Sequence, residues 1–336
     1  MSLATTVFSA DVLKIDAAAV SASIESEIRD IVLQRLNRKG VVIAISGGVD
    51  SSVVAALCHK ALGSGRVLGL MLPEADSSPD SLHFANLLAQ SLGLRTKVED
   101  IAGILSAAGC YQRRDDAIRK VVPHYTEGYK CKIVLPDQVN GSAYPIFSVV
   151  VESPQGERTK ARLTLDSYLG VVAATNFKQR TRKMMEYYYA DRFNYAVAGT
   201  PNRLEYDQGF FVKNGDGAAD LKPIAHLYKT QVYQLAAYLG IPQEIQKRPP
   251  TTDTYSLEQS QDEFYFPLPY DRMDLCLYAK NHGLQPQDVA PVIELNAEQV
   301  ARVYHVIDAT RAAASYLHRP PVLCERVPEV TSDVRG

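Results

Sequence analysis

The sequence predicts an α/β protein built on a doubly wound parallel sheet flanked by helices. Short apolar runs rich in β-branched residues, at 41–45, 67–72 and 194–198, alternate with helical segments. Strands and helices that alternate at this spacing form a parallel sheet with right-handed crossovers. With 336 residues, of which 46% are apolar, the chain can bury a large core. We therefore expect one domain over residues 1–336 that carries an insertion at about 110–168.

The first strand leads into a sequence suited to phosphate. Residues 41–45 are followed by Ser46-Gly47-Gly48-Val49-Asp50-Ser51-Ser52, a tight glycine turn that opens an apolar helix. A strand, a glycine turn and a helix N-terminus bind phosphate through unpaired amides and the helix dipole. The segment is no nucleoside-triphosphate P-loop, because no Gly-Lys-Ser/Thr follows at the required spacing. An ordinary strand-turn-helix corner is the alternative, and the Ser-Gly-Gly-x-Asp-Ser pattern is too specific to favour it.

Composition narrows the class of protein. A net charge of −2 gives no reason to expect nucleic acid or membrane partners. The cysteines form no CxxC pair, which argues against a disulfide framework or a zinc site, and Cys58 falls where a helix core residue would. The N-terminus lacks a basic region followed by an apolar run, and no apolar stretch could span a bilayer. These features indicate a cytoplasmic, reduced protein.

Other elements follow from periodicity and capping residues. A third short strand is expected at 96–101, and helices are expected at 16–40, 81–92, 224–239, 271–282 and 296–317. Asp16 caps the first helix and Gly40 ends it, while Asn296 and Gln299 suit a capping box on the last. In a parallel sheet the ligand lies beyond the carboxyl ends of the strands, so the turns after the first two strands face one crevice.

Residues 110–168 interrupt the alternation. A short helix is expected at 113–122, followed by three strand-like runs at 132–135, 146–151 and 158–165. The last two flank a turn at 153–157 and form a hairpin. One face of this hairpin is basic, with Arg158, Lys160 and Arg162. Such a face is usually solvated, and binding of a partner or an anionic substrate is the alternative.

Polar residues gather on a cationic helix and after the next buried strand. The helix starts at Asn176 and carries four cations in its first two turns, where they oppose the dipole unless an anion compensates. Arg180 and Arg182 lie on different faces and could reach two anionic groups, although a solvated face is the alternative. Thr200 and Glu205 follow the strand at 194–198 and fall in the same crevice. The glycines and aspartates of 209–220 form a structured loop without the ligand spacing of a calcium site.

Six segments together resemble the NAD synthetase family of ATP pyrophosphatases: residues 46–51, 176–182, 199–205, 210–220, 223–232 and 250–253. Their order and approximate spacing match the family over residues 16–280, apart from the insertion. The resemblance implies a Rossmann-like ATP-pyrophosphatase fold with an inserted β-hairpin. It also implies that ATP adenylates the nicotinate carboxylate of deamido-NAD with release of pyrophosphate, after which ammonia displaces AMP to give NAD.

The resemblance assigns roles residue by residue. It implies that Asp50, Glu205 and Thr251 hold magnesium, whose preferred ligands are oxygens. The residues implied for ATP are Ser46, Gly47, Gly48, Asp50, Ser51, Ser52, Arg182, Thr200, Lys229 and Thr251. Those implied for deamido-NAD are Asn176, Arg180, Tyr187, Lys213, Asp216 and Asp220. Asp50, Asp216 and Lys229 would be catalytic, with Asp216 holding ammonium and accepting its proton. A homodimer is also implied.

Some features depart from the family pattern or leave alternatives open. Met71 stands where the family often has an arginine, so one adenosine or phosphate contact is missing or supplied elsewhere. The 40 residues before the first strand cannot hold a glutaminase domain, so we expect free ammonia or a separate glutaminase subunit as the nitrogen source. The competing interpretations are a related ATP pyrophosphatase that amidates or thiolates another adenylated substrate, and a nucleotide-binding regulator with a degenerate site.

Overall fold

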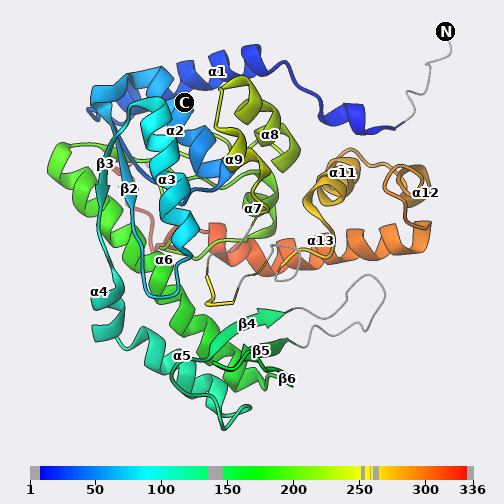
Figure 1. Ribbon diagram of the computed structural model, residues 1–336. Coiled ribbons are helices and arrows are strands. Elements are labelled where there is room, and N and C mark those ends of the chain that lie inside the picture. Colours follow the sequence, from blue (N-terminus) through cyan, green and yellow to red (C-terminus); the bar gives the residue numbers. More distant parts are fainter. Residues whose placement is uncertain (1–7, 135–146, 251–253, 258, 260–264, 331–336) are drawn as a thin grey trace.

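A computed structural model describes residues 8–134, 147–250, 254–257, 259 and 265–330. Its centre is a four-stranded parallel sheet in the order β3–β2–β1–β7 (Figure 1), made of β3 (Arg95–Val98), β2 (Val67–Met71), β1 (Val41–Ala44) and β7 (Ala196–Val197). The chain moves outward from β1 to β2 and β3, then returns to place β7 on the other side of β1. This reversal creates a crevice at the carboxyl end of β1.

Helices cover both faces of the sheet, as the sequence predicts. Val41 and Ile43 of β1 face a cluster that includes α1 (Ala17–Asp30), α2 (Val49–Leu62), α3 (Pro79–Leu92) and α8 (Lys229–Tyr238). Val42 points the other way, into a cluster with α4 (Ala102–Ala107), the first residue of α5 (Cys110–Arg119) and α6 (Leu165–Phe193). Alternate side chains of one strand therefore reach opposite layers. The predicted α/β fold with a doubly wound parallel sheet is confirmed.

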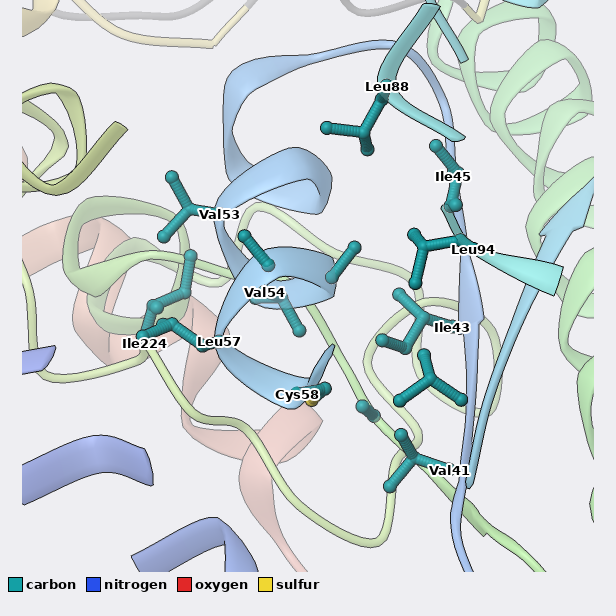
Figure 2. Close-up of a cluster of buried hydrophobic side chains, with 14 of the residues drawn as sticks. Val41, Ile43, Ile45, Val53, Val54, Leu57, Cys58, Leu88, Leu94 and Ile224 are labelled. Carbon is teal, nitrogen blue, oxygen red and sulfur yellow. The ribbon is translucent and has the colours of Figure 1, made fainter. Parts of the chain in front are cut away.

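Helix α2 is buried on nearly all sides (Figure 2). Val41 and Ile43 of β1 point toward one side of it, and Leu57 lies beside Ile224 on the other. Cys58 is fully buried in the same cluster, as expected. Burying a side chain such as Leu57 contributes about 1.5–3 kcal/mol, so α2 is firmly held and its N-terminus has a fixed position at the crevice.

Within the segment 110–168, the described residues 110–134 and 147–168 form a small α+β unit at the lower end of the molecule in Figure 1. β4 (Lys130–Val134), β5 (Ser148–Glu152) and β6 (Arg158–Arg162) make an antiparallel sheet in the order β4–β5–β6. The predicted hairpin is therefore confirmed as β5–β6, and β4 adds a third strand. Arg158, Lys160 and Arg162 are exposed, and Arg158 pairs with Glu152 at 2.7 Å.

Helix α6 is longer than predicted. It begins at Leu165, where the Thr164 hydroxyl accepts a hydrogen bond from the Ser167 amide, so Asn176 lies well inside the helix. The expectation that the cations of this helix oppose its dipole is therefore wrong, because the dipole acts in the first turn. Gly170 does not break the helix. A side chain there would approach Ala117 of α5 to 2.9 Å, so the glycine allows the two helices to pack closely.

Two further helix boundaries differ from the prediction. The first helix is capped by Asp16 as expected but continues only through η2 (Ile31–Arg35), because Asn37 takes a φ of +49° that no α-helix can continue through. Gly40 instead allows close approach of the Arg66 carbonyl. The helix expected from Ile224 starts at Lys229, which puts this lysine at the N-terminus of α8.

The remaining described elements complete the fold: η1 (Ala10–Leu13), η3 (Ser64–Arg66), α7 (Arg203–Gln208), α9 (Gln243–Lys247), α11 (Tyr270–Asn281), α12 (Pro286–Val289) and α13 (Ala297–His318). The predicted capping box at Asn296 and Gln299 is present. Arg311 of α13 binds Asp207 of α7 with two bonds of 2.6 and 2.7 Å, so the C-terminal helices support α7. In the part of the chain that the structure describes, no helix has the length and apolar character needed to cross a membrane.

Candidate active site

The turn between β1 and α2 is shaped by its own hydroxyl groups. Ser51 Oγ donates to the Gly48 carbonyl at 3.0 Å, and Ser52 Oγ donates to the same carbonyl at 2.8 Å. Gly47 has φ of +78°, and a side chain there would lie 2.7 Å from the Ser81 carbonyl of α3. The turn is therefore fixed before any ligand binds, and Gly47 is needed for packing as well as for the turn.

This turn opens onto a cavity of about 440 Å³ at the carboxyl ends of β1, β2 and β7. We call it the active-site cavity. The predicted residues that line it are Ser46, Gly48, Asp50, Ser51, Asn176, Arg182, Thr200, Glu205, Asp216 and Lys229. Ser52 is fully buried beneath the turn and Gly47 packs on α3, so neither is among the described lining residues. Thr251 lies outside the described residues.

Asp50 and Lys229 form an ion pair at the mouth of the phosphate turn. Asn202 Nδ2 also donates to Asp50 Oδ1 at 3.1 Å. The Lys229 side chain is only 3% exposed. Burial alone would lower the pKa of Lys229, but the neighbouring Asp50 and Glu205 carboxylates outweigh it and raise the pKa, so the ammonium stays charged.

Glu205 and Asn202 are held by a reciprocal capping box at the start of α7. Asn202 Oδ1 accepts from the Glu205 amide at 3.1 Å, and Glu205 Oε2 accepts from the Asn202 amide at 3.2 Å. Glu205 was predicted from the sequence, whereas Asn202 was not. The signal was available, since an asparagine followed three residues later by a glutamate is a typical helix start.

A second missed residue supports the helix that carries Lys229. Asp274 of α11 is fully buried, and its Oδ2 accepts from the Thr230 amide in the first turn of α8 at 2.8 Å. Burial raises the pKa of Asp274 to about 7, even though the bond from Thr230 acts in the opposite direction. Asp274 therefore caps α8. Because 44 residues separate the two partners, no local pattern could have indicated this contact.

The carboxylates of Asp50 and Glu205 offer the hard oxygen ligands that magnesium prefers. Both carboxylates line the active-site cavity, and both raise the pKa of Lys229 through charge attraction. Among the residues that the structure describes, no group of three or more histidine, cysteine or acidic side chains could hold a metal by itself. The two carboxylates fit a magnesium ion that takes its remaining ligands from substrate phosphate and water.

Arg180 and Arg182 of α6 point in different directions, as expected. Arg182 lines the cavity and approaches the Leu72 carbonyl with Nε at 3.5 Å. Arg180 instead donates to the Lys213 carbonyl at 3.3 Å and is not among the described lining residues.

Three other residues predicted for deamido-NAD share this outer location. The Tyr187 hydroxyl donates to Asp220 at 3.2 Å, and Asp220 also accepts from the Val197 amide at 2.7 Å. Lys213 donates to the carbonyls of Tyr316 and Arg319 at 2.9 and 3.1 Å. Arg180 and Lys213 thus form one contacting pair and Tyr187 and Asp220 form another, and none of the four is among the described residues that line the active-site cavity.

Asp216 lies at the cavity wall, where its Oδ1 accepts from the Val212 amide at 2.7 Å. Burial raises the pKa of its carboxyl group. A neighbouring pair, Lys183 and Glu186, was not predicted. Both residues are buried and line the same cavity, and their charged groups lie 2.8 Å apart. Their spacing of three residues on one helix was the available signal. Burial likewise raises the pKa of Glu186.

Met71 is buried in β2 and lines the cavity between Leu70 and Leu72. Another part of the chain contributes a cation to the same cavity. Arg248 lines the cavity, donates to Ser81 Oγ at 3.1 Å and lies 5.2 Å from the centre of the Phe84 ring. Arg248 was not predicted from the sequence, because only folding brings it next to α3.

A glycine turn, a buried lysine and two carboxylates meet at the switch point of a parallel sheet, an arrangement typical of nucleotide-binding α/β proteins. A model of the NAD synthase family matches residues 20–123 and 144–314. The chain belongs to this family. The match leaves out residues 124–143, which lie within the segment interpreted above as an insertion.

Individual relatives agree. The chain is 57% identical over 324 residues to the NH(3)-dependent NAD(+) synthetase of Rhizobium meliloti, covering 96% of this chain and 97% of the relative. It is 33% identical over 298 residues to the NH(3)-dependent NAD(+) synthetase of Thermotoga maritima, covering 88% and 96%.

Solved structures share the fold. The NH3-dependent NAD synthetase of Campylobacter jejuni, in complex with the nitrate ion, aligns with a TM-score of 0.60 at 23% identity, covering 93% of this chain and all of that chain. The NMN synthetase of Francisella tularensis aligns with a TM-score of 0.64 at 21% identity, covering 92% and 99%. At such identities the likeness concerns the fold alone.

Proposed function

We propose that this chain is an ammonia-dependent NAD synthetase, a ligase that forms a C–N bond. It adenylates the nicotinate carboxylate of deamido-NAD with ATP and then amidates it with ammonia, giving NAD, AMP and pyrophosphate. One observation carries the proposal. A single cavity combines a phosphate-binding turn and a charged lysine with the carboxylate of Asp216, so both half-reactions can occur without release of the intermediate.

In the first half-reaction, a carboxylate oxygen of the substrate bonds to the α-phosphorus of ATP and the bond to pyrophosphate breaks. A carboxylate is a poor acyl donor, and adenylation gives it a good leaving group. Charge develops on the departing pyrophosphate, where the turn amides, Lys229 and Arg182 can neutralise it. The raised pKa of Lys229 supports this role, because the ammonium then keeps its charge at any physiological pH.

Magnesium would be held by Asp50 and Glu205 together with Thr251, and it would neutralise phosphate charge when bound. The ion pair between Asp50 and Lys229 supports an exchange of partners. With ATP bound, Asp50 would hold the metal and Lys229 would bind the phosphate, so neither charge would be left without a partner. Arg248 supplies a further cation to the cavity in which Met71 stands at the position of the family arginine.

In the second half-reaction, ammonia attacks the carbonyl carbon of the adenylate, AMP leaves and one proton is released. We assign Asp216 to hold ammonium and accept its proton. The burial that raises the pKa of Asp216 supports this role, because a more basic carboxylate is a better proton acceptor.

The remaining assignments extend beyond the cavity. Asn176 contacts deamido-NAD inside it, while Arg180, Tyr187, Lys213 and Asp220 contact the same dinucleotide outside it, which supports a ligand that extends toward a second protomer of a homodimer. We further propose a single domain with an insertion at about 110–168, a cytoplasmic location and free ammonia as nitrogen source, whether or not a separate glutaminase supplies it.

The decisive experiment supplies ATP, magnesium and deamido-NAD with either ammonium or glutamine, and measures NAD, AMP and pyrophosphate. We expect equal amounts of the three products with ammonium and little product with glutamine. A parallel reaction replaces deamido-NAD by nicotinate mononucleotide, which tests whether the smaller acid is preferred. Preference for the mononucleotide, or pyrophosphate release only with a nucleobase or tRNA, would contradict the proposal and favour another amidating ATP pyrophosphatase.

A further inference from the structure

A buried cluster of charges lies behind the active-site cavity. Lys178 of α6 is 1% exposed, and its ammonium donates to Asp76 Oδ2 at 2.6 Å and to the Thr254 carbonyl at 2.8 Å. It also pairs with Glu74, whose Oε1 lies 3.0 Å away. The ammonium thus donates two hydrogen bonds, while Glu74 Oε1 lies within ion-pair distance but accepts no hydrogen bond. Lys178 is not among the described residues that line the cavity.

The three oxygens come from two segments that form different walls of the cavity. Glu74 and Asp76 belong to the turn after β2, which contributes Ser77 and Ser78 to the lining. The third oxygen is the backbone carbonyl of Thr254, which lines the cavity together with Tyr255. Lys178 therefore joins two walls that lie 178 residues apart in the sequence, from Asp76 to Thr254.

The 110–168 segment holds the same two walls from behind. Arg114 of α5 pairs with Asp76, and the Tyr111 hydroxyl donates to Glu74 Oε2 at 2.9 Å. On the other wall, the Leu257 amide donates to the Cys131 carbonyl of β4 at 3.1 Å, and Ser256 Oγ accepts from the Cys131 amide at 2.9 Å. Lys178 thus sits where both walls meet the 110–168 segment.

We propose that Lys178 is a positioning residue that fixes the separation of these two walls and thereby shapes the nucleotide end of the cavity, with the 110–168 segment as its support. The phosphate turn follows β1, and the turn that contains Glu74 and Asp76 follows β2. A nucleotide bound at the phosphate turn therefore reaches the turn after β2 along the edge of the sheet. We call the contacts of Lys178 with Glu74, Asp76 and the Thr254 carbonyl the clamp. That this end of the cavity binds ATP rests on the proposed function, whereas the clamp itself does not.

Ion pairing explains why the clamp is stable in a buried place. Burial alone would raise the pKa of Asp76, but Lys178 and Arg114 outweigh it and lower the pKa, so the carboxylate stays ionised. A neutral side chain at position 178 would leave Glu74 without its cation and release the Thr254 carbonyl. The first effect concerns stability and the second concerns geometry, so the two can be separated by experiment.

The test compares Lys178→Met with the double variant Lys178→Met/Glu74→Gln, in which the charge balance is restored. In both variants we expect the KM for ATP to rise about tenfold while kcat changes less. The substitutions displace a wall of the cavity that binds ATP, whereas the residues that act on the reacting atoms stay in place. We expect backbone amide hydrogen exchange at 255–257 to become faster. Thermal stability should fall in the single variant and recover in the double variant.

Lys280→Met is the matched control, because Lys280 pairs with Asp308 on the C-terminal helices at 2.7 Å, away from the cavity. It should leave KM and exchange at 255–257 unchanged. Wild-type KM and exchange in the double variant would overturn the positioning role, since Lys178 would then only balance charge. The double variant carries the test if the single variant does not fold. Failure of the wild type to form NAD would contradict the proposed function instead, and the exchange measurement would still test the clamp.

Discussion

The carboxylate of Asp50 contacts two side chains from distant parts of the chain, Lys229 and Asn202. We predict that Asp50→Asn abolishes turnover and costs less stability than Asp50→Ala, because the amide oxygen can still accept a bond from Lys229 but is a weaker metal ligand. Asp50→Ala should also cost stability, since removing one member of a buried ion pair costs about 3–5 kcal/mol. Product formation and urea unfolding of both variants check this. Near wild-type turnover in Asp50→Asn would contradict the magnesium assignment.

Asp216 allows the two half-reactions to be separated. We predict that Asp216→Asn keeps ATP-dependent pyrophosphate release but loses most amidation, by about 10²–10⁴-fold, because no carboxylate accepts the ammonium proton. In the wild type, amidation should rise with pH through the pKa of Asp216, which burial raises above its ordinary value. Single-turnover measurements of pyrophosphate and NAD across pH test both statements. Equal loss of both products in the variant would argue against the assigned role.

Asp274 couples stability to pH. Its pKa is about 7 in the folded chain, against an ordinary value near 4 in the unfolded chain. Between these values the folded state binds more protons, so the free energy of unfolding decreases as pH rises, by up to about 1.4 kcal/mol per pH unit. Asp274→Asn should lose this decrease. Urea unfolding at pH 5 and pH 8 measures it, and an unchanged pH dependence in the variant would show that Asp274 is not responsible.

The functional residues that could be predicted from the sequence have their partners or motif neighbours close by in the chain, whereas those that could not be predicted have distant partners. Asp50, Glu205 and Lys229 stand in continuous motifs, so their chemistry was readable from neighbouring positions. Asp274 and Lys178 act through partners 44 to 102 residues away, which only the fold brings together. The family resemblance assigned Arg180 and three further residues outside the cavity to the dinucleotide. Their spacing in the sequence did not indicate that they lie outside it.

At the scale of single elements, α5 and α6 show how one glycine sets a helix contact. Gly170 would place a side chain 2.9 Å from Ala117, whereas a side chain at Gly103 of α4 meets nothing within 4 Å. We predict that Gly170→Ala destabilises the protein by about 1–3 kcal/mol through overpacking. Gly103→Ala, the matched control, should stabilise it by up to about 1 kcal/mol through helix propensity. Urea midpoints compare the two, and stabilisation in both variants would show that α5 moves aside freely.

The error in the start of α6 has the same origin. Sequence periodicity favoured a helix from Asn176, because Gly170 and the β-branched residues that follow it lower helix propensity. Packing against α5 overrides that preference, and Thr164 supplies the N-cap directly before Leu165. Thr175 lies in the helix interior, where its hydroxyl donates to the Val171 carbonyl at 2.7 Å. Tertiary contacts, not local propensity, decide where this helix begins.

At the scale of the whole molecule, the parallel sheet and its crevice were predictable because the strands and helices around them carry local sequence signals. The role of residues 110–168 was not predictable, since it depends on contacts with residues 255–257, which lie far away in the sequence. Tyr255 packs in the same apolar cluster as Cys131, Ile133 and Val149. The segment therefore forms part of the structure behind the active-site cavity.

We therefore expect substitutions on the exposed and on the buried face of the 110–168 segment to have different effects. Removing the exposed charges with Arg158→Gln, Lys160→Gln and Arg162→Gln should leave both KM values and the unfolding midpoint nearly unchanged, because exposed ion pairs contribute at most about 1 kcal/mol. Val149→Asp, on the buried face of β5, should destabilise the segment strongly and raise the KM for ATP by loosening the wall at Tyr255. Steady-state kinetics with urea unfolding distinguish the two. A large KM change in the triple variant would instead mean that the basic face itself binds substrate.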